Sequence, residues 1–134
     1  GAVLTQKHQN KRKRSMEPKR PLQEKSYAFA VRIVRLCQYL VHGKGEYVLS
    51  RQILRSGTSI GANAAESRYA LGARDLRAKL SISLKECEET LYWLNLLKDT
   101  GYLTEAQFSS LDRDCQELRR LLISSVKTLQ QKAE

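Results

Sequence analysis

The stretch RQILRSGTSIGANAAES, residues 51–67, is crowded with small side chains in a helix-like spacing. Gly57, Gly61 and Ala65 recur every four residues, so a helix places all three on one face. Glycine inside a helix costs roughly 1 kcal/mol relative to alanine. Two glycines one turn apart therefore predict that the backbone of another helix comes very close to this face.

Apolar residues with helical periodicity extend on both sides of this stretch and predict four helices. These span residues 23–41, 50–70, 74–100 and 104 to the C-terminus. Gly43 is expected to end the first helix, Gly72 to separate the second from the third, and Gly101 to end the third. Ser50 is a candidate N-cap for the second helix, and TEAQ (104–107) has the form of a capping box.

Four long amphipathic helices with short connections predict an all-α domain, an antiparallel up-down-up-down four-helix bundle over residues 23–134. The segment LYWLNLL (91–97) is apolar around nearly its whole circumference, and one neighbouring helix cannot cover all of it. We therefore expect a homo-oligomer. The expected interface residues are Tyr92, Trp93, Leu96 and Leu97.

Charge is distributed unevenly along the chain, whose formal net charge is +10. Residues 1–25 carry eight Lys or Arg against two Glu, and residues 26–85 carry ten against three acidic side chains. Residues 86–134 carry six basic against nine acidic side chains. Residues 1–22 are expected to form a basic, flexible tail. This asymmetry predicts a polyanionic partner, most simply RNA or DNA, against the alternative of a solvated surface without a specific ligand.

The three cysteines, Cys37, Cys87 and Cys115, are far apart and form no CxxC or Cys/His spacing. They are expected to be buried, reduced thiols of a cytoplasmic protein rather than metal ligands. No apolar run reaches the roughly 18 residues that a membrane span requires, so no membrane partner is expected.

Glu86 and Glu89, with Glu66 and Asn63, offer carboxylates without the histidine that a di-iron bundle site needs. We therefore expect no metal and no cofactor. Ion pairs between helices or subunits, for example with Arg51 or Arg55, are the expected role of these glutamates.

Two longer motifs carry a family resemblance: LSRQILRSGTSIGANAAES (49–67) and KLSISLKECEETLYWLNLLKDTGYL (79–103). Together they resemble the bacterial 23S rRNA intervening-sequence protein family, also called the four-helix-bundle protein family, over roughly residues 26–130. The resemblance implies a small non-enzymatic bundle that assembles into a ring-like homopentamer. A related branch, the accessory variability protein of diversity-generating retroelements, implies nucleic-acid binding and association with a reverse transcriptase.

Candidate nucleic-acid contacts are cations and one tyrosine on faces that periodicity leaves exposed. Arginine can bind phosphate through two hydrogen bonds, and tyrosine can stack on an unpaired base. The candidates are Lys11, Arg12, Lys13 and Arg14 in the tail, Arg32, Arg35 and Tyr39 in the first helix, Arg51, Arg55 and Arg68 in the second, and Arg74 and Arg77 in the third. No helix carries a DNA-reading signature, so we expect contacts to the phosphate backbone rather than to base edges. For any single arginine, an ordinary solvated face with ion pairs is the alternative.

The sequence thus predicts a non-catalytic protein that binds RNA or DNA. The first alternative is a protein adaptor, an accessory subunit of a reverse transcriptase. The second is a HEPN-type ribonuclease, because Arg35 and His42 have six residues between them, as in the loose Arg–His motif of such enzymes. However, Leu36 stands where that family usually has a polar residue, and no catalytic residue is predicted.

Overall fold

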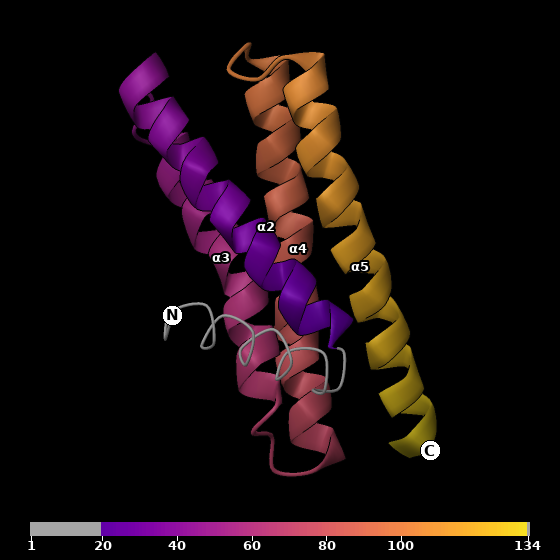
Figure 1. Cartoon of the computed structure of the whole chain (residues 1–134). Helices are drawn as coiled ribbons and strands as arrows, with labels where there is room; N and C mark the ends of the chain where they lie inside the picture. The colour runs from indigo at the N-terminus through magenta and orange to yellow at the C-terminus, as the bar shows by residue number, and fades with distance from the viewer. Residues whose placement is uncertain (1–19, 134) are drawn as a thin grey trace, which may run out of the picture.

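The computed structural model describes residues 20–133. Within this range the chain is all-α, with four α-helices and no strand. The elements are α2 (Pro21–Gln38), its continuation in the π-helical turn η1 (Tyr39–Gly43), α3 (Leu49–Ser67), α4 (Ala73–Asp99) and α5 (Glu105–Ala133). Figure 1 shows helices that follow one another in the chain lying side by side, with short loops between them. No helix in this range is long and apolar enough to cross a membrane.

The first helix continues further than the sequence predicts. Gly43 lies inside η1, and Gly45 is the residue with the left-handed φ of 64°. The Leu40 carbonyl oxygen accepts hydrogen bonds from the N–H groups of Lys44 and Glu46, the latter at 2.9 Å. The helical segment does end at Gly43, but Gly43 is the last residue of the π-turn and not a left-handed residue beyond the helix, so the helix runs two residues past the predicted end at residue 41.

The cap of α3 also differs from the prediction. The helix begins at Leu49, so Ser50 lies within its first turn and is not the N-cap. The carboxylate of the buried Glu46 accepts a hydrogen bond from the Ser50 N–H at 3.0 Å. The Glu46 carbonyl oxygen accepts a second one from the Ser50 hydroxyl at 3.1 Å. Ser50 is thus a hydrogen-bond donor to Glu46, whose carboxylate satisfies one of the open N–H groups in the first turn of the helix.

Gly72 and Gly101 lie at helix ends as predicted, but two bounds differ: α2 begins at Pro21, inside the predicted tail of residues 1–22, and α3 ends at Ser67 and not at residue 70. Gly72 precedes α4 with a φ of 95°, and Gly101 follows α4 with a φ of 84°. The Gln107 N–H donates to the Thr104 hydroxyl at 3.1 Å, and the Thr104 N–H donates to the Gln107 side-chain oxygen at 2.9 Å. This reciprocal pair is the predicted capping box.

The glycine stripe of α3 packs against α2, as its spacing predicts. A methyl group on Gly57 would lie 2.8 Å from the side chain of Ile33, and one on Gly61 would lie 3.1 Å from the main-chain oxygen of Ser26. Both distances are shorter than ordinary contacts, so only glycine fits without a shift. Ala65, the third member of the stripe, is exposed and lies beyond this close contact.

Apolar side chains from all four helices fill the core. The largest fully buried ones are Phe29, Ile33, Leu40, Ile53, Ile60, Leu94, Leu97, Leu118 and Leu122. The three cysteines are free thiols buried among them, as predicted.

Small polar side chains line the contact between α3 and α4. The Ser83 hydroxyl donates to the Ile60 carbonyl oxygen at 2.8 Å, and the hydroxyls of Thr90 and Ser56 are hydrogen-bonded at 2.9 Å. Their small volume lets the two helices approach closely while their polar atoms stay satisfied. By contrast, α2 packs along α3 but meets α5 at fewer points, which leaves a hollow between α2 and α5.

Candidate nucleic-acid interface

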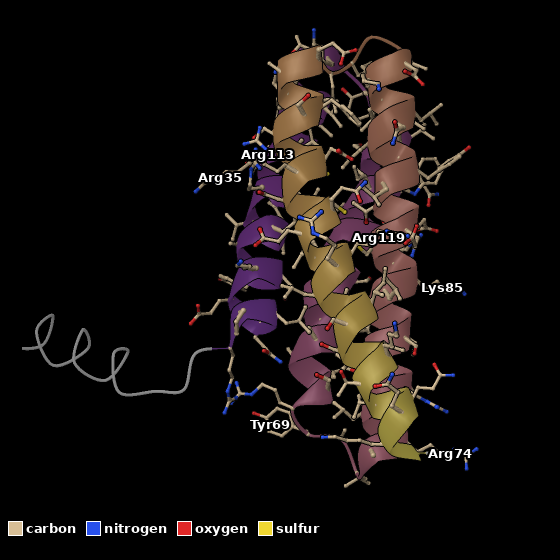
Figure 2. The ribbon with its side chains drawn as sticks, turned by 90° about the vertical axis from the view of Figure 1, so that its right-hand side faces the viewer. Arg35, Tyr69, Arg74, Lys85, Arg113 and Arg119 are labelled. Atoms are coloured by element: carbon tan, nitrogen blue, oxygen red, sulfur yellow. The ribbon has the colours of Figure 1, made fainter. Side chains whose placement is uncertain are left out.

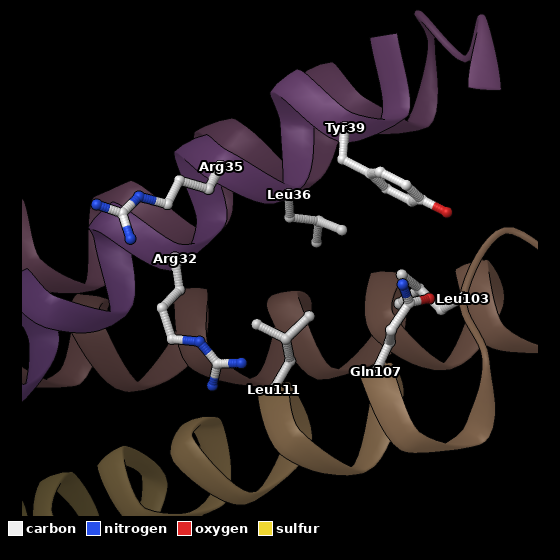
Figure 3. A pocket seen from close by; sticks show the side chains of 7 residues that line it. All are labelled: Arg32, Arg35, Leu36, Tyr39, Leu103, Gln107 and Leu111. Atoms are coloured by element: carbon white, nitrogen blue, oxygen red, sulfur yellow. The ribbon is translucent and has the colours of Figure 1, made fainter. Parts of the chain in front are cut away.

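The hollow between α2 and α5 brings three of the predicted contact residues together (Figure 3). Its volume is about 290 Å³. It is lined by Arg32, Arg35, Leu36, Tyr39, Leu103, Gln107 and Leu111. The three leucines are at least nine-tenths buried and form an apolar floor, while the polar side chains surround it.

Arg32 ties the two walls of this hollow together. Its guanidinium donates to the Asp114 carboxylate at 2.6 Å, to the Ser110 hydroxyl at 2.8 Å and to the Ser110 carbonyl oxygen at 3.2 Å. Much of its hydrogen-bonding capacity is therefore engaged within the protein. In this chain Arg32 positions α2 against α5, and it is a poorer candidate for a phosphate contact than the sequence predicts.

Arg35 and Tyr39 are more accessible. Arg35 is exposed and makes no ion pair with any residue that the structure describes. Tyr39 is 39% exposed, and the ammonium group of Lys44 lies 5.9 Å from its ring centroid. The lining of the hollow thus includes a guanidinium without an ion pair in the described range and an accessible aromatic ring, and Lys44 lies beside that ring.

Arg55, by contrast, is engaged across α3 and α4. It pairs with Glu86 at 3.2 Å and with Glu89. The hydrogen bond with Glu89 is the main cause that raises the pKa of Arg55. This contact is the interhelical ion pair that the sequence allowed for these glutamates. Arg51, one turn earlier, is exposed and has no ion pair in the described range.

The remaining predicted arginines lie toward the end of the molecule where α3 leads into α4. Arg68 lines two neighbouring hollows, of about 300 and 420 Å³, between the start of α2 and the end of α3. Arg74 is exposed in the first turn of α4, and Arg77 is half-buried one turn later. Figure 2 shows Arg74 and Tyr69 at this end and Arg35 nearer the opposite one. Among the described residues, the predicted cations therefore line separate hollows and helix faces and are not gathered in one place.

Other predicted positions can be placed as follows. Lys11, Arg12, Lys13 and Arg14 lie outside the described residues. His42 is exposed in η1 and does not line the hollow that Arg35 lines. In residues 20–133, no group of histidine, cysteine, aspartate or glutamate side chains is arranged to hold a metal ion.

The predicted oligomer interface needs one correction. Tyr92 is 61% exposed, and its ring meets the ring of Trp93 edge to face at 5.0 Å. Trp93 and Leu96 are half-buried. Leu97, however, is fully buried in the core of its own chain, so it cannot contact a second copy. The helix turns Leu97 inward together with Leu94 and Leu91.

Sequence reasoning missed Gln107 and the tyrosines Tyr27 and Tyr69. Gln107 was read as a helix cap, which it is, yet the same side chain lines the hollow between α2 and α5. Tyr27 and Tyr69 are 73% and 79% exposed. The helical periodicity of the sequence could have indicated the exposure of Tyr27, because Tyr27 directly follows the buried Ser26 and therefore points away from the core face of the helix.

These features define the class of protein: residues 20–133 form a small all-α, four-helix domain, and carboxylates of the same range pair with only some of its arginines. Residues 21–124 match the family of 23S rRNA-intervening sequence proteins, and the chain belongs to this family.

A solved structure supports the fold assignment. The chain is similar to a protein of unknown function from the S23 ribosomal protein family of Bacteroides thetaiotaomicron VPI-5482, with 51% sequence identity and a TM-score of 0.78. The match covers 79% of this chain and 98% of that one. Among functionally curated proteins, none matches this sequence.

Proposed function

We propose that this protein is a non-catalytic, homo-oligomeric nucleic-acid-binding protein that contacts the phosphates of RNA or DNA through its arginines. The observation that carries the proposal is a surplus of unpaired guanidinium groups. Arg35, Arg51, Arg68, Arg74 and Arg77 form no ion pair within residues 20–133. Free arginines can each donate two hydrogen bonds to a phosphate.

Several of the acidic residues that could neutralise this surplus are already paired with other cations. Carboxylates of α4 and α5 pair with cations on a neighbouring helix: Glu86 and Glu89 with Arg55, Glu88 with Arg119, Asp114 with Arg32 and Glu117 with Lys25. The remaining positive charge supports association with a polyanion.

The hollow between α2 and α5 is the first proposed contact site. Arg35 would bind a phosphate, and Tyr39 would offer its ring to a sugar or base. The Gln107 side-chain oxygen already accepts a hydrogen bond from Thr104, so its amide nitrogen is the group left to donate to a ligand.

We further propose an antiparallel up-down-up-down topology and assembly as a homopentamer. The order of contacts supports the topology, because Ser26 lies against Gly61 whereas Cys37 lies against Ser50, further along α2 but earlier in α3. The exposed ring of Tyr92 supports a contact between copies. Repetition of one phosphate site around a ring would strengthen binding without any new contact. Free, buried thiols fit a cytoplasmic protein.

The proposal is tested by fluorescence anisotropy with labelled RNA and DNA oligonucleotides over a salt series. Wild-type protein is expected to bind both at low salt, with an affinity that falls steeply as salt rises. Arg35→Gln and Arg51→Gln should each weaken binding and lower the salt slope by about 1. Arg55→Gln is the matched control, because its guanidinium is already paired with two carboxylates.

Failure to bind either nucleic acid at low salt would reject the proposal and favour the adaptor function. Equal losses for Arg35→Gln and Arg55→Gln would show that binding responds to net charge and not to the unpaired arginines.

A further inference from the structure

Two exposed tyrosines flank a pair of hollows that the arginines of the first site do not reach. One hollow is lined by Gln23, Tyr27, Ala30, Thr58, Gly61, Ala62, Ala65 and Arg68. Its neighbour is lined by Arg20, Gln23, Arg68 and Tyr69. The two share Gln23 and Arg68, so they form one continuous surface, which we call the α2–α3 surface.

The α2–α3 surface contains cations and aromatic rings but no carboxylate. Arg20 and Arg68 make no ion pair in the described range, and neither hollow is lined by an acidic residue. Glu66, which is close to Arg68 in sequence, is engaged by Lys79 at 3.1 Å. Among the described residues that line the two hollows, the charged side chains are therefore arginines, which favours an anionic ligand.

The two tyrosines are held in the open and not in the core. Tyr27 is 73% exposed on α2, and Tyr69 is 79% exposed in the turn that follows α3, where Figure 2 shows it at the end of the molecule. Exposed aromatic rings beside arginines are the elements that bind unpaired bases, by stacking, and their phosphates. A duplex hides its base faces, so rings of this kind would add nothing to duplex binding.

The shape of the surface also favours a base over a helix from a second copy. Gly57 and Gly61 of α3 already pack against α2 of the same chain, so they are not available for close packing with a helix of a second copy. What remains is a hollow of about 300 Å³ whose lining includes Ala62 and Ala65, at the lower end of the size range for small-ligand sites. A second copy would also bring its own positive charge to a cationic surface.

The start of α2 adds to the anion-binding character. Arg20 is the N-cap residue, and no described side chain caps this end of the helix. Pro21, the first helical residue, has no N–H, so among the described residues the N–H groups of Leu22 and Gln23 have no helical partner beside the hollow that Arg20 lines, where the helix dipole favours negative charge.

We propose that the α2–α3 surface binds unpaired nucleotides of single-stranded nucleic acid, with Tyr27 and Tyr69 stacking on bases and Arg20 and Arg68 binding the intervening phosphates. This inference rests on the proposed function and adds to it a preference for single strands.

The test compares a 15-nucleotide single strand (oligo-dT and oligo-U) with a 15-base-pair duplex in the anisotropy assay, using the full chain. The double variant Tyr27→Leu/Tyr69→Leu should lose about tenfold in single-strand affinity per tyrosine and leave duplex affinity unchanged. The control is Tyr47→Leu, since Tyr47 is 58% exposed but lies at the opposite end of α3, outside both hollows. Photo-crosslinking with 4-thiothymidine should label peptides that contain Tyr27 or Tyr69.

The outcomes separate this inference from the proposed function. If wild-type protein binds neither strand form, the proposed function fails. If it binds both forms but the double variant keeps the wild-type preference, or matches Tyr47→Leu, the α2–α3 surface is not a single-strand site. A change of oligomer mass in the double variant, with the preference retained, would show instead that the surface joins copies of the chain.

Discussion

Replacing Gly57 with alanine should destabilise the protein, although alanine is the better helix former. The added methyl group would lie 2.8 and 2.9 Å from the Cγ1 and Cγ2 atoms of Ile33 and 3.3 Å from its Cβ. Favourable carbon–carbon contacts lie at about 3.5–4.0 Å, so one of the two helices must move by about 0.7 Å. Ile33 is fully buried and branched at Cβ, and it cannot turn away by a change of rotamer.

The magnitude follows from two opposing effects. Overpacking of a core costs about 1–3 kcal/mol. Removing an interior glycine returns about 1 kcal/mol of helix propensity. Because three atoms of a fixed side chain are crowded at once, we expect the cost to lie in the upper part of its range. The net loss in the free energy of unfolding is then about 1–2 kcal/mol.

Urea unfolding followed by circular dichroism measures this loss, at one fixed protomer concentration because the chain can associate. Gly43→Ala is the matched control: its new methyl group would meet only the Tyr39 ring, at an ordinary 3.5 Å. That variant should be as stable as wild type or more stable, by up to about 1 kcal/mol.

A double-mutant cycle with Ile33→Ala tests the cause. Ile33→Ala should cost less in the Gly57→Ala background than alone, because it relieves the crowding there. If Gly57→Ala is as stable as Gly43→Ala, or if the two changes add within about 0.5 kcal/mol, the close contact does not limit this packing.

Three further predictions concern other contacts. Ser83→Ala should lower the free energy of unfolding by about 1 kcal/mol, since it removes the buried hydrogen bond to the Ile60 carbonyl oxygen, whereas the exposed Ser81→Ala should change it by less than about 0.5 kcal/mol. Arg55→Gln should lower the free energy of unfolding by less than about 1 kcal/mol at low salt and by still less in 1 M NaCl, because the Arg55 side chain is 49% exposed. A loss of the same size at both salt concentrations, measured by urea unfolding, would contradict this. Burial raises the pKa of Cys37 from 9.0 to about 11, so the thiol ionises first in the unfolded chain and stability should fall as the pH rises from about 9 to about 11. The same pH titration of unfolding should be flatter for Cys37→Ala, and identical curves would exclude this thiol as a cause.

The features that local spacing determines were predictable from the sequence. The glycine stripe repeats every four residues, so its face and its close neighbour follow from helix geometry alone. The capping box of Thr104 and Gln107 is equally local. The end of the first helix was missed because a π-turn changes the number of residues per turn, which the apolar pattern does not reveal.

Features that depend on how two helices are placed relative to each other were not predictable. Leu97 was assigned to a subunit interface because its segment is apolar all round, and only the position of the neighbouring helices decides which side faces inward. The Ser56–Thr90 hydrogen bond could not be predicted for the same reason, because nothing in the sequence around either residue indicates that the two side chains meet. Tyr27 and Tyr69 lie 42 positions apart in the sequence and flank one surface only because α2 and α3 pack together.

The basic residues of the first half of the chain fall into two groups, and only the fold shows which residue belongs to which: some form ion pairs between helices, and others stay unpaired. Lys25, Arg32 and Arg55, from the basic first half, pair with carboxylates of the acidic second half, so part of the asymmetry stabilises contacts between helices. Composition alone would assign all of that charge to a ligand. What the pairs leave over is a smaller set of cations, among them Arg35 in the hollow between α2 and α5 and Arg68 on the α2–α3 surface. A polyanion would meet these residues and not the paired ones, which is why a variant at Arg35 and a variant at Arg55 remove the same charge yet should differ in binding.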